Sequence, residues 1–160
     1  MTKSSSSAST KVSRTSKAPR GAVYRAFLDP DLLARWLPPE TMTGQVHAFD
    51  PRPGGQIQMS LTYEDSEHAP HGKTSAHTDT FRGRFVELVP DETIVWAVQF
   101  DSPDPSFAGE MKITWSLADA PAGTEVTVLC ENIPAGILPA DNEAGSASSL
   151  ENLAALVERV

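Results

Sequence analysis

The sequence has little or none of several features that define other classes of protein. Cys130 is its one cysteine, so no disulfide bond can form within the chain. No apolar run approaches the roughly 18 residues that a membrane-spanning helix needs. No apolar segment follows Lys3, as it would in a secretory signal. These absences together predict a cytoplasmic protein with no membrane partner.

Acidic residues are absent from positions 1–20, which carry five basic side chains. Subtracting these five charges from the net charge of −8 leaves −13 on residues 21–160. Such an acidic body repels a phosphate backbone, so we expect no nucleic-acid partner. The serine-rich run at residues 4–9 has low complexity and cannot build a core, which predicts a disordered basic tail over residues 1–9. A single domain would then occupy residues 10–160, a length that buries roughly 70% of the surface of the unfolded chain.

Motifs that carry catalysis are also missing. We find no glycine-rich phosphate loop, no convincing Ser-His-Asp order and no carboxylate pair on a buried face, and we therefore expect no catalytic residues and no cofactor. The histidines of the polar segment 65–78, His68, His71 and His77, are irregularly spaced, so we predict a solvated loop rather than a zinc site. Cys130 has no base or positive charge nearby in the sequence, which favours a small buried side chain over a nucleophile.

The last stretch of the chain has the strongest helical pattern. Leu150, Leu153, Ala154 and Val157 recur at i, i+3, i+4 and i+7, which is one face of an amphipathic helix. A serine followed three residues later by a glutamate is a capping box and predicts a start at residue 148, with a start near residue 141 as the alternative. Burying these side chains requires a large apolar surface elsewhere in the chain.

The rest of the chain supplies that surface as strands. Two short helices are expected first, over 19–28 with Pro19 at the first helical position, and over 30–37 with Asp29 as the N-cap. Alternation with a period of two then predicts strands, and Pro-Arg-Pro-Gly-Gly at 51–55 predicts a hairpin loop. The predicted strands span 10–17, 45–50, 56–64, 81–89, 93–100, 111–117 and 125–130. We therefore predict an α+β antiparallel meander wrapped on its C-terminal helix.

The ordered motifs of this chain resemble those of the SRPBCC superfamily, the START or Bet v 1-like helix-grip fold. The most similar branch is that of activators of heat-shock protein 90 ATPase. The motifs are Ala-Pro at 18–19 before Val-Tyr-Arg-Ala-Phe at 23–27, Asp-Pro to Trp-Leu at 29–37, Asp-Pro-Arg-Pro-Gly-Gly at 50–55, Gly-Arg-Phe-Val-Glu-Leu-Val-Pro at 83–90, and Gly-Thr-Glu-Val-Thr at 123–127. Two positions depart from the pattern. Ser146 follows Gly145 where relatives usually have tryptophan, and Cys130 stands where many have histidine.

The resemblance implies a curved antiparallel sheet wrapped on a long C-terminal helix, with two short helices after the first strand and an apolar cavity beneath the long helix. The residues expected around this cavity are aromatic and aliphatic, and the same set also describes an ordinary core. They are Trp36, Met59, Tyr63, Phe85, Trp96, Met111, Trp115, Leu153 and Val157.

Three functions are compatible with this resemblance. The first is non-enzymatic binding of a hydrophobic small molecule. The second is a co-chaperone-like interaction with heat-shock protein 90 in the stress response. The third is polyketide cyclase or aromatase chemistry, for which Tyr63 and His47 are the only polar candidates. Exposed edge strands leave both a monomer and a homodimer open.

Overall fold

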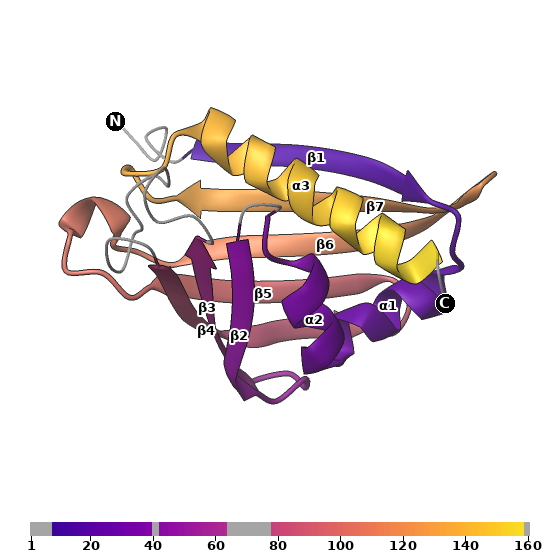
Figure 1. Ribbon diagram of the computed structural model, residues 1–160, viewed down its shortest axis with the longest axis horizontal. Helices are drawn as coiled ribbons and strands as arrows, with labels where there is room; N and C mark the ends of the chain where they lie inside the picture. Colours follow the sequence, from indigo (N-terminus) through magenta and orange to yellow (C-terminus); the bar gives the residue numbers. More distant parts are fainter. Residues whose placement is uncertain (1–7, 40–41, 64–77, 159–160) are drawn as a thin grey trace.

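The computed structural model describes residues 8–39, 42–63 and 78–158, and one seven-stranded sheet crossed by a long C-terminal helix dominates it (Figure 1). The elements follow the predicted order. They are β1 (Ala8–Ser16), α1 (Arg20–Leu28), α2 (Pro30–Trp36), β2 (Met42–Phe49), β3 (Gln56–Tyr63), β4 (Thr78–Val89), β5 (Thr93–Phe100), the short 3-10 helix η2 (Pro105–Phe107), β6 (Met111–Ala120), β7 (Gly123–Ile133) and α3 (Pro139–Glu158). The predicted α+β helix-grip architecture is confirmed.

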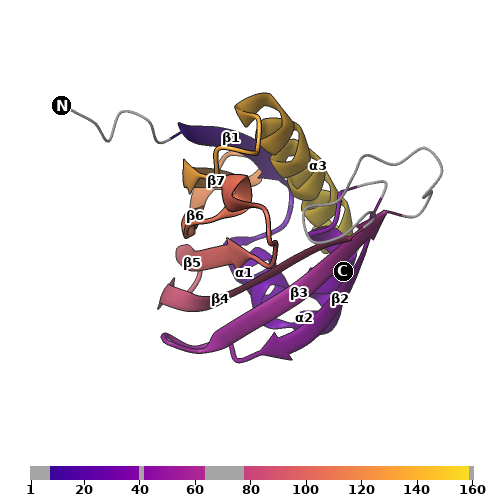
Figure 2. The same cartoon turned by 90° about the vertical axis from the view of Figure 1, so that its left-hand side faces the viewer.

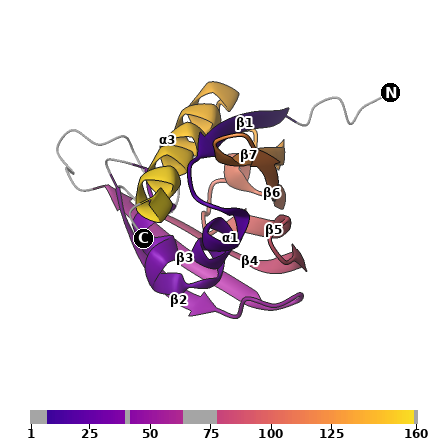
Figure 3. The ribbon, with the colours of Figure 1, turned by 90° about the vertical axis from the view of Figure 1, so that its right-hand side faces the viewer.

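Every strand pair is antiparallel, and the order across the sheet is β1-β7-β6-β5-β4-β3-β2. The six strands from β2 to β7 form a meander, and β1 pairs with β7 at one edge of the sheet. The sheet curves, and all three α-helices lie on its concave side (Figures 2 and 3). None of the helices in the described ranges is long and apolar enough to cross a membrane.

The start of α2 is as predicted, whereas the start of α1 differs. Asp29 caps α2 by accepting hydrogen bonds from the backbone N–H groups of Asp31 at 2.9 Å and Leu32 at 3.4 Å, and Pro30 follows at the first helical position. Pro19 was expected at the first position of α1 but is its N-cap, because its ψ of 160° is extended rather than helical.

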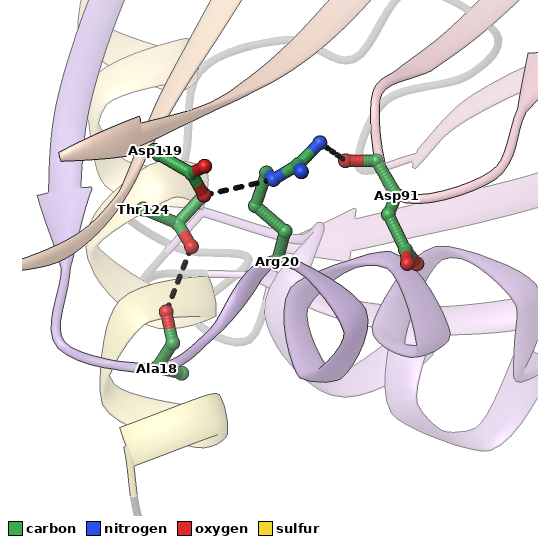
Figure 4. Close-up of polar contacts among 5 residues, drawn as sticks. All are labelled: Ala18, Arg20, Asp91, Asp119 and Thr124. Carbon is green, nitrogen blue, oxygen red and sulfur yellow. Dashed lines mark hydrogen bonds and ion pairs between the residues drawn. The ribbon is translucent and has the colours of Figure 1, made fainter.

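Polar contacts tie the entrance to α1 to two hairpins (Figure 4). Arg20 Nε pairs with Asp119 Oδ1 at 2.9 Å, and Arg20 Nη1 donates to the carbonyl oxygen of Asp91 at 3.0 Å. Thr124 Oγ1 donates to the carbonyl oxygen of Ala18 at 2.8 Å. Gly123 lies next to this connection, and a Cβ there would come within 2.2 Å of the Ser16 carbonyl oxygen, so only glycine allows the approach.

Two predicted boundaries are wrong. Ala8 and the following serine belong to β1 rather than to the tail, because Ala8 pairs with Ile133 at the end of β7; residues 1–7 lie outside the described residues. α3 begins at Pro139, close to the alternative start near residue 141 and not at the capping box at residue 148, and the Leu138 carbonyl accepts the backbone N–H groups of its first turn. The serine that we predicted as a cap therefore lies inside the helix, because the helix has an additional polar half with no apolar periodicity.

The core lies between the concave face of the sheet and the helices. The predicted face of α3 is buried, including Leu150, Leu153 and Val157. The alternation of β6 is also confirmed, with Trp115 buried and its neighbour Ser116 exposed. At the outer end of the β2–β3 hairpin, Asp50 and Arg52 form an ion pair at 2.9 Å on the surface.

Candidate functional site

The structure buries every predicted lining residue whose side chain it describes. Their exposed fractions range from 0% for Met59 to 5% for Val157. The residues are Trp36, Met59, Phe85, Trp96, Met111, Trp115, Leu153 and Val157. Tyr63 is the last residue of β3, and its side chain lies outside the described ones. Burial is common to a ligand pocket and to an ordinary core, so the contacts among these residues must distinguish the two.

One half of the interior is filled by aromatic rings in mutual contact. The ring centroids of Phe27 and Trp36 are 4.8 Å apart, those of Trp36 and Trp115 are 5.3 Å apart, and those of Trp96 and Trp115 are 5.5 Å apart. Edge-to-face rings at such distances are typical of a packed core. This cluster lies where α1 and α2 cover the sheet, and its rings pack on one another.

Two polar atoms in this cluster lack partners. Trp36 Nε1 donates to the Ala26 carbonyl oxygen at 2.9 Å. Trp96 Nε1 and Trp115 Nε1 are buried, and among the described residues no acceptor lies within hydrogen-bonding distance of either. A buried donor without an acceptor costs about 1–3 kcal/mol of desolvation, so two neighbouring ones require an explanation.

The other half of the interior is not fully closed. Ile113 lies on the concave face of a central strand, opposite Trp96 on β5 and Cys130 on β7. Both partners are almost fully buried, yet Ile113 is only partly buried. Leu61 and Phe100 on the same face are also only partly buried. Solvent therefore reaches apolar side chains on the inner face of the sheet.

α3 packs on β1 and β7 beside this region, and its first half carries small and polar side chains. Asn142, Ser146 and Ser149 are spaced three to four residues apart, so they lie on one side of the helix. All three are buried or half-buried, and Leu153 lies on the same side further along the helix. Ser149 Oγ donates to the backbone carbonyl of the residue after α2, which fixes the middle of α3. Our sequence prediction missed this polar stripe, although its spacing of three to four residues could have revealed it.

Cys130 belongs to a polar cluster under the same half of α3. Its thiol is hydrogen-bonded with Asn142, Thr10 and Ser146, and Thr10 Oγ1 donates to Asn142 Oδ1. Burial raises the pKa of the Cys130 thiol, and these hydrogen bonds lower it by less. Cys130 is 3% exposed, which confirms the expected small buried side chain.

His47 does not reach the interior. It is exposed on the convex side of the sheet, where its Nε2 is 2.7 Å from Ser60 Oγ, and Ser60 Oγ is 2.8 Å from Thr80 Oγ1. Our nomination of His47 for cyclase chemistry in the cavity is therefore wrong, because His47 alternates with Val46, whose side chain packs on the core.

The described residues contain no group of three or more histidine, cysteine, aspartate or glutamate side chains placed to bind a metal ion. His68, His71 and His77 lie outside the described residues. A shallow surface hollow of about 370 Å³ lies between α2 and β2. It is lined by Pro30, Asp31, Ala34, Val46, His47, Ala48 and Phe49.

Comparisons with known proteins agree with this fold. The family model described as "Activator of Hsp90 ATPase homolog 1-like protein" matches residues 17–158. A crystal structure of a protein from Chromobacterium violaceum is 38% identical, with a TM-score of 0.82, over 94% of this chain and 96% of that chain. No curated protein sequence matches the chain.

More distant structures share the fold. The AHSA1-like protein from Aeromonas hydrophila is 19% identical, with a TM-score of 0.69, over 95% of this chain and 93% of that one. A protein from Mycobacterium smegmatis is 16% identical, with a TM-score of 0.72, over 92% and 89%.

Proposed function

Because this chain belongs to the family of Activator of Hsp90 ATPase homolog 1-like proteins, we propose that it is a cytoplasmic protein that binds an apolar small molecule between its sheet and α3 without catalysing a reaction. The fold commonly binds hydrophobic ligands. The observation that carries the proposal is the partial exposure of Ile113 on the concave face of a central strand, between nearly buried neighbours.

The chemistry around Ile113 supports the same proposal. Ile113, which lies opposite Trp96 and Cys130, offers apolar contact area, and Asn142 and Ser146, which interact with Cys130, offer a polar end. A mostly apolar wall with a few polar groups is the usual composition of a small-molecule site. We call Ile113, Cys130, Asn142 and Ser146 the Ile113 region. The aromatic cluster next to it supplies a rigid floor, since its rings are already packed on one another.

The test is a titration of protein labelled at the isoleucine δ1 methyl groups with the apolar probe 2-isopropenylnaphthalene, followed by NMR. We expect the Ile113 signal to shift and to saturate at one equivalent of probe. The Ile57 signal should stay, because Ile57 is fully buried under the packed half. Native mass spectrometry of protein purified gently from its own cells would then identify the natural ligand.

A surface variant is the matched control for this titration. Val86 is 44% exposed and could hold an apolar probe by itself. Val86→Ser should therefore leave the Ile113 shift unchanged. If Ile113 does not shift, or if the shift disappears in Val86→Ser, the probe does not occupy the interior and the proposal fails.

A second candidate function is an interaction with a chaperone, which the family's description suggests. The observation that favours it is the hollow between α2 and the edge strand β2, where Val46, Ala48 and Phe49 offer apolar contacts to a partner. We expect the chain to raise the ATPase rate of a heat-shock protein 90 if this surface is used. Ala48→Glu should then reduce the stimulation, while Val86→Ser should not. No stimulation by the unmodified chain would contradict this candidate.

A further inference from the structure

Two buried indole donors border the Ile113 region. Trp96 is paired with Ile113 across β5 and β6, and Trp115 follows Ile113 by two positions, so both project from the same face of the sheet. Trp96 is 1% exposed and Trp115 is 3% exposed, and neither Nε1 has an acceptor among the described residues. Two donors without an acceptor among the described residues thus flank Ile113, a side chain of this face that solvent reaches.

We infer that the molecule bound in the Ile113 region is a neutral carbonyl compound whose oxygen accepts a hydrogen bond from Trp96 Nε1 or Trp115 Nε1. This inference rests on the proposed function, because it specifies the ligand of the same site. An indole N–H can donate but cannot accept, so its partner must be an acceptor. An occupant with a carbonyl oxygen would satisfy a donor that the folded chain leaves unsatisfied.

The ligand is inferred to be neutral because no cationic side chain is buried in the described part of the chain. The buried polar residues that the structure describes are Thr10, Ser16, Asp79, Thr80, Thr124 and Ser149. This set contains no lysine or arginine, so a carboxylate or phosphate bound there would lose its hydration without gaining a countercharge. A ketone or ester loses far less hydration free energy on burial than a carboxylate or phosphate does, and it still has a carbonyl oxygen that accepts a hydrogen bond. This distinguishes the inferred class from fatty acids and other anions.

An isosteric pair of probes tests the inference. 2-Acetylnaphthalene and 2-isopropenylnaphthalene differ in that a carbonyl oxygen replaces a methylene group. We expect the ketone to move the indole N–H signal of Trp96 or Trp115 in ¹H–¹⁵N spectra of the unmodified chain, and the alkene to leave it in place. Trp36 is the internal reference among the three tryptophans, because its Nε1 is already bonded to the chain.

Phenylalanine variants separate the hydrogen bond from the ring. Trp96→Phe and Trp115→Phe retain an aromatic ring but remove the donor, so the affinity for the ketone should fall by about tenfold in one of them. The affinity for the alkene should change by no more than about twofold. The spectra of the unmodified chain decide the question even if a variant fails to fold.

The outcomes distinguish this inference from the function on which it rests. If neither probe binds, the proposed function and the inference both fail. If both probes bind with similar affinity and neither indole signal moves, the binding function stands and the inference is overturned. The inference is also overturned if both indoles are found bonded to water that the ketone does not displace.

Discussion

Replacing Trp36 by alanine is expected to lower the free energy of unfolding by about 3–5 kcal/mol. Trp36 has no exposed surface and contacts Phe27 and Trp115 with its ring. Its removal would leave a cavity that packed neighbours can fill only in part, and would also leave the Ala26 carbonyl oxygen without its donor. Urea denaturation monitored by circular dichroism measures the loss.

Two comparison variants define what this loss means. Trp36→Phe keeps a ring in the cluster but removes the hydrogen bond to Ala26, so we expect a smaller loss of about 1–3 kcal/mol. Leu138→Ala changes a side chain that is 64% exposed, and it should alter stability by less than about 0.5 kcal/mol. A loss below about 1 kcal/mol for Trp36→Ala would contradict the packed cluster, because it would mean that the ring occupies loosely filled space.

The elements with strong local signals could be predicted from the sequence. Asp29 before a proline marks the start of α2, because a carboxylate can cap and a proline suits the first helical turn. Strict alternation likewise placed Trp115 and its neighbours on the inner face of β6. In both cases the deciding interactions lie within a few residues of one another along the chain.

Boundaries that depend on distant partners could not be predicted in the same way. The first strand extends to Ala8 because Ile133, far along the chain, is there to pair with it. The first half of α3 has no apolar periodicity, and its helical state reflects packing against other elements, as when Ser149 donates to the Leu37 carbonyl oxygen. Propensity and pattern do not contain these tertiary contacts.

The candidate site could likewise be predicted from the sequence only in part. Alternation with a period of two identifies the inward residues of β6, which include Ile113, but the partial exposure of Ile113 depends on neighbours from other elements. The sequence likewise placed Trp96 and Trp115 inside, but whether an acceptor lies near their N–H groups is a matter of three-dimensional neighbours. The direction of a side chain thus follows from the strand that carries it. Its exposure to solvent and its hydrogen bonds depend on the helices and strands that pack around it.

The departure at Ser146 leads to the second large effect. Ser146 is half-buried in α3 and its hydroxyl is hydrogen-bonded to Cys130, which lies opposite Ile113 in the sheet. Ser146→Trp, which introduces the residue usual in relatives, would extend a large ring over Ile113. We expect the affinity for 2-isopropenylnaphthalene to fall at least about tenfold, because the ring would occupy the volume that the probe needs. Isothermal titration calorimetry measures the change.

A neighbouring position provides the matched control. Ala147 is exposed on the other side of α3, so Ala147→Trp adds the same side chain to the same helix turn without reaching the sheet. Its affinity for the probe should stay within about twofold of that of the unmodified chain. If Ser146→Trp remains folded by circular dichroism and binds as well as Ala147→Trp, the probe does not lie over Ile113. If only Ser146→Trp loses binding, the serine is what keeps this half of the interior open in a chain whose other half is closed by aromatic rings.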